Sequence, residues 1–104
     1  MPRNMLLKGL RPTHPGEVLR EDVIPALHKS KTEIADLLGV SRPTLYDVLN
    51  EKRPITPNLA LRIAKLVGGG PEIWLRMQQA YDLSATEKAI AKELAHIPTL
   101  HAAE

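Results

Sequence analysis

The sequence predicts an all-α fold, in which five helices form one domain around a helix-turn-helix and a short C-terminal helix follows. Two observations support this prediction. Residues 30–53 contain two short amphipathic patterns, each opened by a serine and separated by a glycine. Elsewhere, apolar residues recur at the three- and four-residue spacings of helices, between prolines and glycines that mark helix ends.

Length and composition restrict the protein to a small class. The chain has 104 residues and no cysteine, which is enough for one domain and excludes a disulfide framework or a thiolate metal site. No apolar run approaches the roughly 18 residues of a membrane helix. We therefore expect a soluble protein of the cytoplasm that does not associate with a membrane. A net charge of +2 permits a nucleic-acid partner without requiring one.

Residues 1–12 are predicted to form an N-terminal arm outside the helical domain. They hold three basic residues and no acidic one, and their apolar residues follow no helical period. Whether Met5 and Leu10 pack on the helices stays open. The predicted helix-turn-helix domain then covers residues 13–83, and residues 84–104 are assigned to a C-terminal helix and tail.

The first helix of the domain is expected to begin within residues 13–17. Pro15 suits a first turn, because its missing amide would have no partner there, and Glu17 favours the positive end of the helix. Apolar residues recur on one side through residues 18–23. Pro25 is expected to end or bend this helix.

Two short helices joined by a three-residue turn follow. Ser30 and Glu33 have the spacing of a capping box, and Gly39 stands where a helix end needs a left-handed residue. Ser41 is a second N-cap, and Pro43 is tolerated in the first turn behind it. This arrangement is the helix-turn-helix, whose second helix enters the DNA major groove.

The second of these helices divides into two faces. Apolar residues such as Leu45 and Val48 are expected to bury its inner face. Most of the outer residues can form hydrogen bonds, as a surface that reads a DNA groove requires. They are Ser41, Arg42, Thr44, Tyr46 and Asp47. The alternative is an ordinary pair of helices in a bundle, with no DNA partner.

Three further helices are predicted in the second half of the chain. Thr56 caps the first of them, and three glycines at 68–70 end it. The next begins at Pro71 and Glu72, and its aromatic residues are expected to serve the core or an interface. Ser84 and Glu87 have the spacing of another capping box, so the last helix is expected to start there and to end before Pro98, with a frayed tail.

Three segments of the chain are characteristic: HPGEVLREDVIPAL, TEIADLLGVSRPTLYDVLNEKRPITPNLALRIAKLVGG and GPEIWLRMQQAYDL. With these segments the chain resembles the HigA antitoxin family, a branch of the XRE-type, phage-repressor-like regulators. Together the three segments cover about residues 13–83. Two positions depart from the family pattern, because many relatives have glycine at His28 and a serine cap at Gly70.

The resemblance implies both a function and its partners. Such a protein forms a homodimer, binds a palindromic operator upstream of its own operon and neutralises a HigB toxin, a RelE-like mRNA interferase. Two alternatives stay open: a lone XRE-family regulator without a toxin, and a toxin-binding module that has lost DNA recognition. No cofactor is implied.

The resemblance also assigns DNA contacts to positions of this sequence. Phosphate contacts fall on Ser30 and Lys31 at the first motif helix, and further backbone contacts fall on Asn50, Lys52 and Arg53. The groove-facing set is Ser41, Arg42, Thr44, Tyr46 and Asp47, and Pro43 beside them is also assigned to the DNA-binding residues.

Three of the groove-facing residues have open roles. Arg42 could bind guanine with two hydrogen bonds or only a phosphate. Tyr46 could touch a thymine methyl or a sugar, or be a merely exposed ring. Asp47 could accept from cytosine, aim a neighbouring arginine, or only balance surface charge.

An enzyme is not expected. The four histidines, at 14, 28, 96 and 101, form no pair with the i, i+4 spacing of a helical metal site. His14 with Glu17 is typical of a helix start, and no nucleophile has a plausible base nearby. We therefore expect neither a metal nor a catalytic group.

Overall fold

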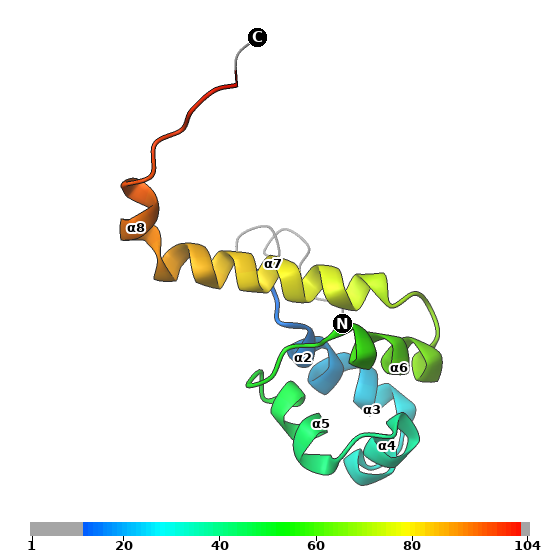
Figure 1. Ribbon diagram of the computed structural model, residues 1–104. Coiled ribbons are helices and arrows are strands. Elements are labelled where there is room, and N and C mark those ends of the chain that lie inside the picture. The colour runs from blue at the N-terminus through cyan, green and yellow to red at the C-terminus, as the bar shows by residue number, and fades with distance from the viewer. Residues whose placement is uncertain (1–11, 103–104) are drawn as a thin grey trace.

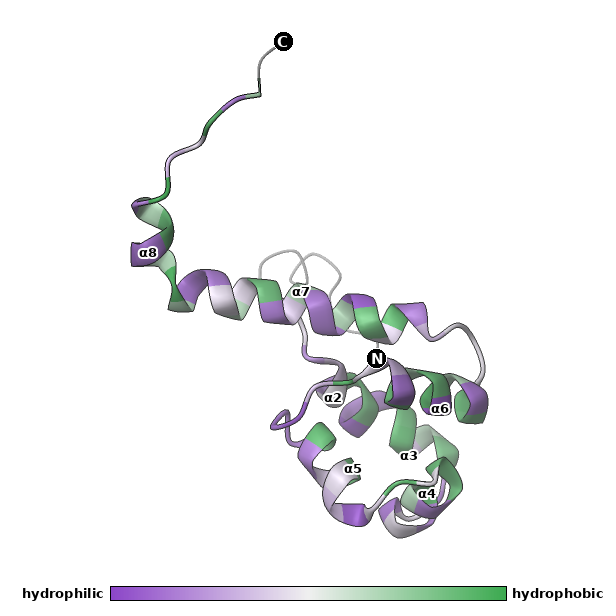
Figure 2. Ribbon diagram, viewed as in Figure 1, coloured by the Kyte–Doolittle hydropathy of each residue, from purple (hydrophilic) through white to green (hydrophobic). Residues whose placement is uncertain are grey.

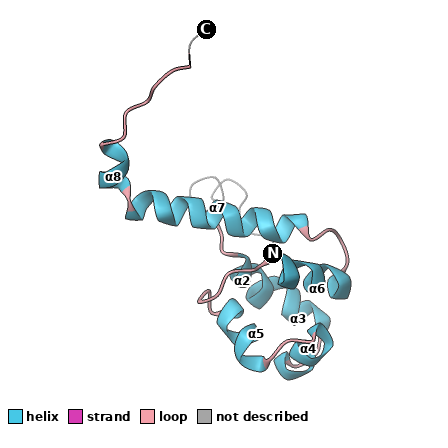
Figure 3. Cartoon of the chain, viewed as in Figure 1, coloured by secondary structure: helices cyan, strands magenta, loops and turns pink. Residues whose placement is uncertain are grey.

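The computed structural model describes residues 12–102, and within them every regular element is a helix (Figures 1 and 3). This confirms the predicted all-α class. Residues 1–11 lie outside the described range, and so does the open question about Met5 and Leu10. No helix in the described part of the chain is long and apolar enough to cross a membrane.

The first helix is continuous through three named pieces: α2 (Pro15–Val18), η1 (Leu19–Val23) and α3 (Ile24–Leu27). The middle piece is a π-helical turn, in which the Ile24 amide donates to the Leu19 carbonyl five residues back. Pro25 therefore does not end the helix, because the wider turn changes the hydrogen-bond pattern just before it. The end comes at His28, whose φ of 54° is left-handed. This conformation explains why glycine suits that position.

The predicted helix-turn-helix consists of α4 (Lys31–Leu38) and α5 (Arg42–Leu49). The capping box of α4 is confirmed: the Glu33 amide donates to Ser30 Oγ at 3.1 Å, and the Ser30 amide donates to Glu33 Oε1 at 3.2 Å. Gly39 ends α4 in the left-handed region at φ 75°. The Ser41 cap of α5 is confirmed as well, since Ser41 Oγ accepts from the Thr44 amide at 3.2 Å.

Three more helices follow: α6 (Pro57–Val67), α7 (Glu72–Ala89) and α8 (Ala91–Ala95). Thr56 caps α6 as predicted. The predicted helix start at Ser84 is wrong, because α7 runs through it without interruption. No glycine or proline lies in the 18 residues of α7, so helix propagation overrides the local capping signal. The chain turns only at Ile90, which has φ −114° and ψ 26°.

One hydrophobic core holds α2 to α6 together, and α7 lies across this group (Figure 1). Trp74, on the first half of α7, is 6% exposed and belongs to that core. Gln78 is buried beside it and accepts from the Ile55 amide at 2.8 Å, which fixes α7 to the loop after α5. The second half of α7 and the whole of α8 extend beyond the core, with apolar residues such as Leu83 and Leu94 exposed (Figure 2).

Candidate nucleic-acid interface

The buried face of α5 fixes which side chains can reach a ligand. Leu45, Val48 and Leu49 are at most 2% exposed, which confirms the predicted inner face. A 3.6-residue repeat then leaves the remaining side chains on the opposite side of the helix. Ser41, Arg42, Pro43, Tyr46 and Asn50 are exposed, and Thr44 and Asp47 are half-buried.

The N-terminal end of α5 is capped by hydrogen bonds that involve the hydroxyl groups of Ser41 and Thr44. The Oγ atoms of Ser41 and Thr44 lie 2.8 Å apart, and Ser41 Oγ also accepts from the Thr44 amide. Arg42 and Pro43 occupy the exposed first turn beside them. This end of the helix carries the positive end of the macrodipole, so it favours an anion such as a DNA phosphate.

The middle of α5 meets the start of α4. Lys31 Nζ lies 5.8 Å from the centre of the Tyr46 ring, over its face. Tyr46 itself is 39% exposed. The structure therefore brings together one residue predicted to contact phosphate and one predicted to face the groove. Ser30, next to Lys31, has its polar groups engaged with Glu33.

The loop after α5 carries the remaining predicted contacts. Asn50, Lys52 and Arg53 are exposed. The Lys52 amide donates to the Asp47 carbonyl at 2.8 Å, and Arg53 Nη2 lies 3.8 Å from Asp47 Oδ2. The long distance between these two side chains, which are 50% and 45% exposed, indicates a weak ion pair. The ion pair does place Asp47 beside Arg53, as is required if the Asp47 carboxylate aims a neighbouring arginine.

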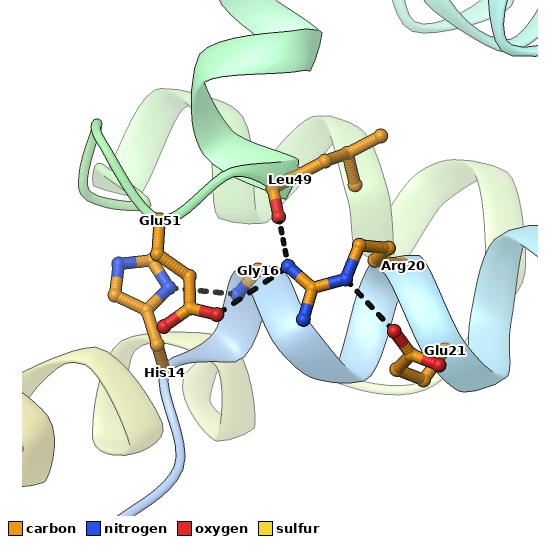
Figure 4. Close-up of polar contacts among 6 residues, drawn as sticks. All are labelled: His14, Gly16, Arg20, Glu21, Leu49 and Glu51. Carbon is orange, nitrogen blue, oxygen red and sulfur yellow. Dashed lines mark hydrogen bonds and ion pairs between the residues drawn. The ribbon is translucent and has the colours of Figure 1, made fainter.

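Arg20 was not predicted from the sequence, yet it connects η1 to the end of α5 (Figure 4). Its Nη1 donates to the Leu49 carbonyl at 2.5 Å and to Glu51 Oε2 at 3.3 Å, while its Nε donates to Glu21 Oε2 at 2.8 Å. Hydrogen bonding to Glu21 and then Glu51 raises the pKa of Arg20 above its ordinary value. No local motif signals these contacts, because they join residues 29 and 31 positions apart.

A glycine allows the first helix to approach α5 this closely. An added Cβ on Gly16 would lie 1.9 Å from the Val48 carbonyl oxygen. The amide of Gly16 donates to Nδ1 of His14 at 2.9 Å, and this bond starts α2 (Figure 4). Gly16 of the HPGE segment therefore lies directly against Val48 near the end of α5.

His14 is a structural residue, as its place at a helix start predicted. It is 3% exposed, and its ring lies edge-on to Tyr81 of α7 with 4.8 Å between the centroids. Burial lowers the pKa of His14. This effect is larger than the opposing effect of the Glu51 and Asp82 carboxylates, which raise the pKa. Within residues 12–102, no group of three or more acidic, histidine or cysteine side chains could hold a metal ion.

Comparison with known proteins agrees with this geometry. The pattern of the helix-turn-helix family matches residues 19–75. Virulence-associated protein I of Dichelobacter nodosus is 40% identical over 75 residues, which are 72% of this chain and 69% of that protein.

Two solved structures have the same fold. The antitoxin HigA of Pseudomonas aeruginosa, solved with the higBA promoter, has a TM-score of 0.82 and 32% identity, covering 88% of this chain and 100% of its own. An addiction module antidote protein of a HigA family from Coxiella burnetii has a TM-score of 0.78 and 36% identity, covering 88% and 99%.

Proposed function

Because this chain belongs to the helix-turn-helix family, in its HigA branch of DNA-binding regulators, we propose that it is an antitoxin that represses its own operon. In this proposal a homodimer binds an inverted-repeat operator and also neutralises a HigB-like, mRNA-cleaving toxin. The observation that supports it most is the outer face of α5, which presents exposed hydrogen-bonding side chains, with Lys31 beside Tyr46 and with Lys52 and Arg53 exposed in the loop that follows. The site of action is the nucleoid in the cytoplasm.

Symmetry determines the form of the proposed operator. A dimer places two copies of α5 in successive major grooves, about 34 Å apart, which is one turn of B-DNA. Each protomer then reads one half-site, and the two half-sites form an inverted repeat. The macrodipole at the N-terminal end of α5 adds an attraction to phosphate that carries no sequence information.

The proposed DNA contacts divide into two kinds. Arg42, in the exposed first turn of α5, is proposed to donate two hydrogen bonds to a guanine edge, which discriminates by about 1 to 3 kcal/mol against other bases. Lys52, in the loop after α5, is proposed to bind phosphate and so to position the protein without reading sequence. Asp47 and Arg53 contribute as a pair, in which the carboxylate aims the guanidinium.

The experiment that tests this division compares Arg42→Ala with Lys52→Ala. Arg42→Ala should weaken binding to the inverted repeat and leave binding to scrambled DNA nearly unchanged. Lys52→Ala should weaken both alike and lower the slope of log Kd against log salt by about one unit. Titrations of labelled duplexes at several salt concentrations measure both effects, and equal effects of the two substitutions would contradict the division.

The toxin half of the proposal has a separate test. A small basic protein encoded beside this chain should co-purify with it, and its mRNA-cleaving activity should fall when this chain is added. If no such neighbour exists, the alternative of a lone XRE-type regulator replaces the antitoxin role, while the DNA-binding part of the proposal stands.

A further inference from the structure

The loop after α5 has an unusual local conformation. Glu51 lies in the left-handed region at φ 62°, where a side chain with a Cβ is strained. Its amide donates to the Val48 carbonyl at 3.0 Å, and the next amide, of Lys52, donates to the Asp47 carbonyl at 2.8 Å. These two bonds form the motif that commonly ends a helix with glycine at the left-handed position. Here a glutamate occupies that position.

The glutamate gives this helix end a contact that glycine could not provide. Its carboxylate accepts from Arg20 Nη1 at 3.3 Å, and the same nitrogen donates to the Leu49 carbonyl at the end of α5 (Figure 4). Arg20 and Glu51 are both half-buried, with side chains 32% and 30% exposed, so solvent screens the contact less than a fully exposed pair. We call these three residues, Arg20, Leu49 and Glu51, the α5 clasp.

The position of the α5 clasp relates it to the proposed DNA contacts. Lys52 and Arg53 follow Glu51 directly and are exposed. The backbone that carries Lys52 and Arg53 is therefore held in place by the α5 clasp at the end of α5. Without Arg20, the Glu51 carboxylate would also stand unneutralised beside these two cations, next to a polyanionic ligand.

We propose that Arg20 is a positioning residue for operator recognition, which holds the loop at residues 50–53 at a fixed place relative to α5. This inference rests on the proposed function. Phosphate contacts set the register of a protein on its duplex, so their placement matters most when base contacts must form at the same time. Random DNA accepts many arrangements and does not need a fixed loop. Loosening the loop therefore lowers operator affinity selectively, whereas deletion of a phosphate-binding cation such as Lys52 lowers both affinities.

Arg20→Lys is the principal test, because it keeps the charge but replaces a planar group of five donors with a compact ammonium that cannot reproduce the geometry. Arg76→Lys, an exposed position on α7, is the matched control. At a temperature where every variant is folded, Arg20→Lys should weaken binding to the upstream inverted repeat about tenfold and change binding to scrambled DNA by less than about twofold. In hydrogen exchange, the Lys52 amide should exchange faster.

A second variant covers the case in which Arg20→Lys does not fold. Glu51→Gly suits the left-handed backbone and removes the side chain whose carboxylate accepts from Arg20. The clasp predicts a lower ratio of operator affinity to random-DNA affinity. A role of charge alone would raise both affinities and leave that ratio unchanged.

The inference is overturned if Arg20→Lys lowers thermal stability but leaves the affinity ratio and the Lys52 exchange rate unchanged, which would make Arg20 a structural residue only. It is also overturned if Glu51→Gly leaves the ratio unchanged. Failure of the proposed function looks different, because the unmodified protein would then bind both duplexes equally.

Discussion

Gly16→Ala tests the close contact between the first helix and α5. The added Cβ would lie 1.9 Å from the Val48 carbonyl oxygen, which is 1.5 Å short of the 3.4 Å at which ordinary contact begins. The obstacle is backbone, so the helices must separate. Such overpacking costs about 1 to 3 kcal/mol, and we expect a value near the upper end because the overlap is large. The better helix propensity of alanine returns up to about 1 kcal/mol.

The net expectation is a loss of about 2 kcal/mol in the free energy of unfolding, or about 8 to 16 °C in Tm for a domain of this size. Thermal and urea denaturation followed by circular dichroism, at one protein concentration, measures it. Gly70→Ala is the matched control, because there the nearest atom to the new Cβ belongs to the flexible carboxylate of Glu72. If Gly16→Ala melted within about 2 °C of the unmodified protein, the close approach would be refuted.

Three further predictions concern stability. Burial lowers the pKa of His14 below its usual 6.5, so the unfolded chain takes up a proton first. The free energy of unfolding should therefore fall as pH drops below 6.5. The difference between the urea midpoints at pH 7.5 and pH 5.5 should be smaller in His14→Asn than in the unmodified protein. His28→Gly should stabilise by about 0.5 to 1 kcal/mol, because φ is 54° there, whereas His28→Ala should not. Arg62→Ala removes a donor to the Leu38 carbonyl at 2.9 Å and should cost about 1 kcal/mol by urea denaturation, compared with little for Arg76→Ala.

Local signals in the sequence predicted most helix ends of the fold. The caps at Ser30, Ser41 and Thr56 and the left-handed turn at Gly39 are confirmed, because each depends on residues within one helical turn. The same kind of signal misled at Ser84, where an uninterrupted helix continues through a sequence that could also start one.

Contacts between distant segments could not be predicted in this way. Hydropathy assigned α5 its buried face, but nothing in the pattern shows that Arg20 reaches Leu49 or that Gly16 lies against Val48. Such pairings depend on how helices pack, and packing is decided by the whole core. The assignment of DNA contacts to the outer face of α5 remains a prediction, supported by exposure and by the Lys31–Tyr46 contact.

Titration of the purified protein against its own upstream region, with a scrambled duplex of equal length as the control, tests the central claim most directly. It must be done at several salt concentrations, because an affinity at one salt concentration does not separate specific from electrostatic binding. We predict tight binding to an inverted repeat with half-sites about one helical turn apart, and binding to the scrambled duplex weaker by at least about a thousandfold. Equal, weak binding to both duplexes at every salt concentration would contradict the claim that α5 reads an operator.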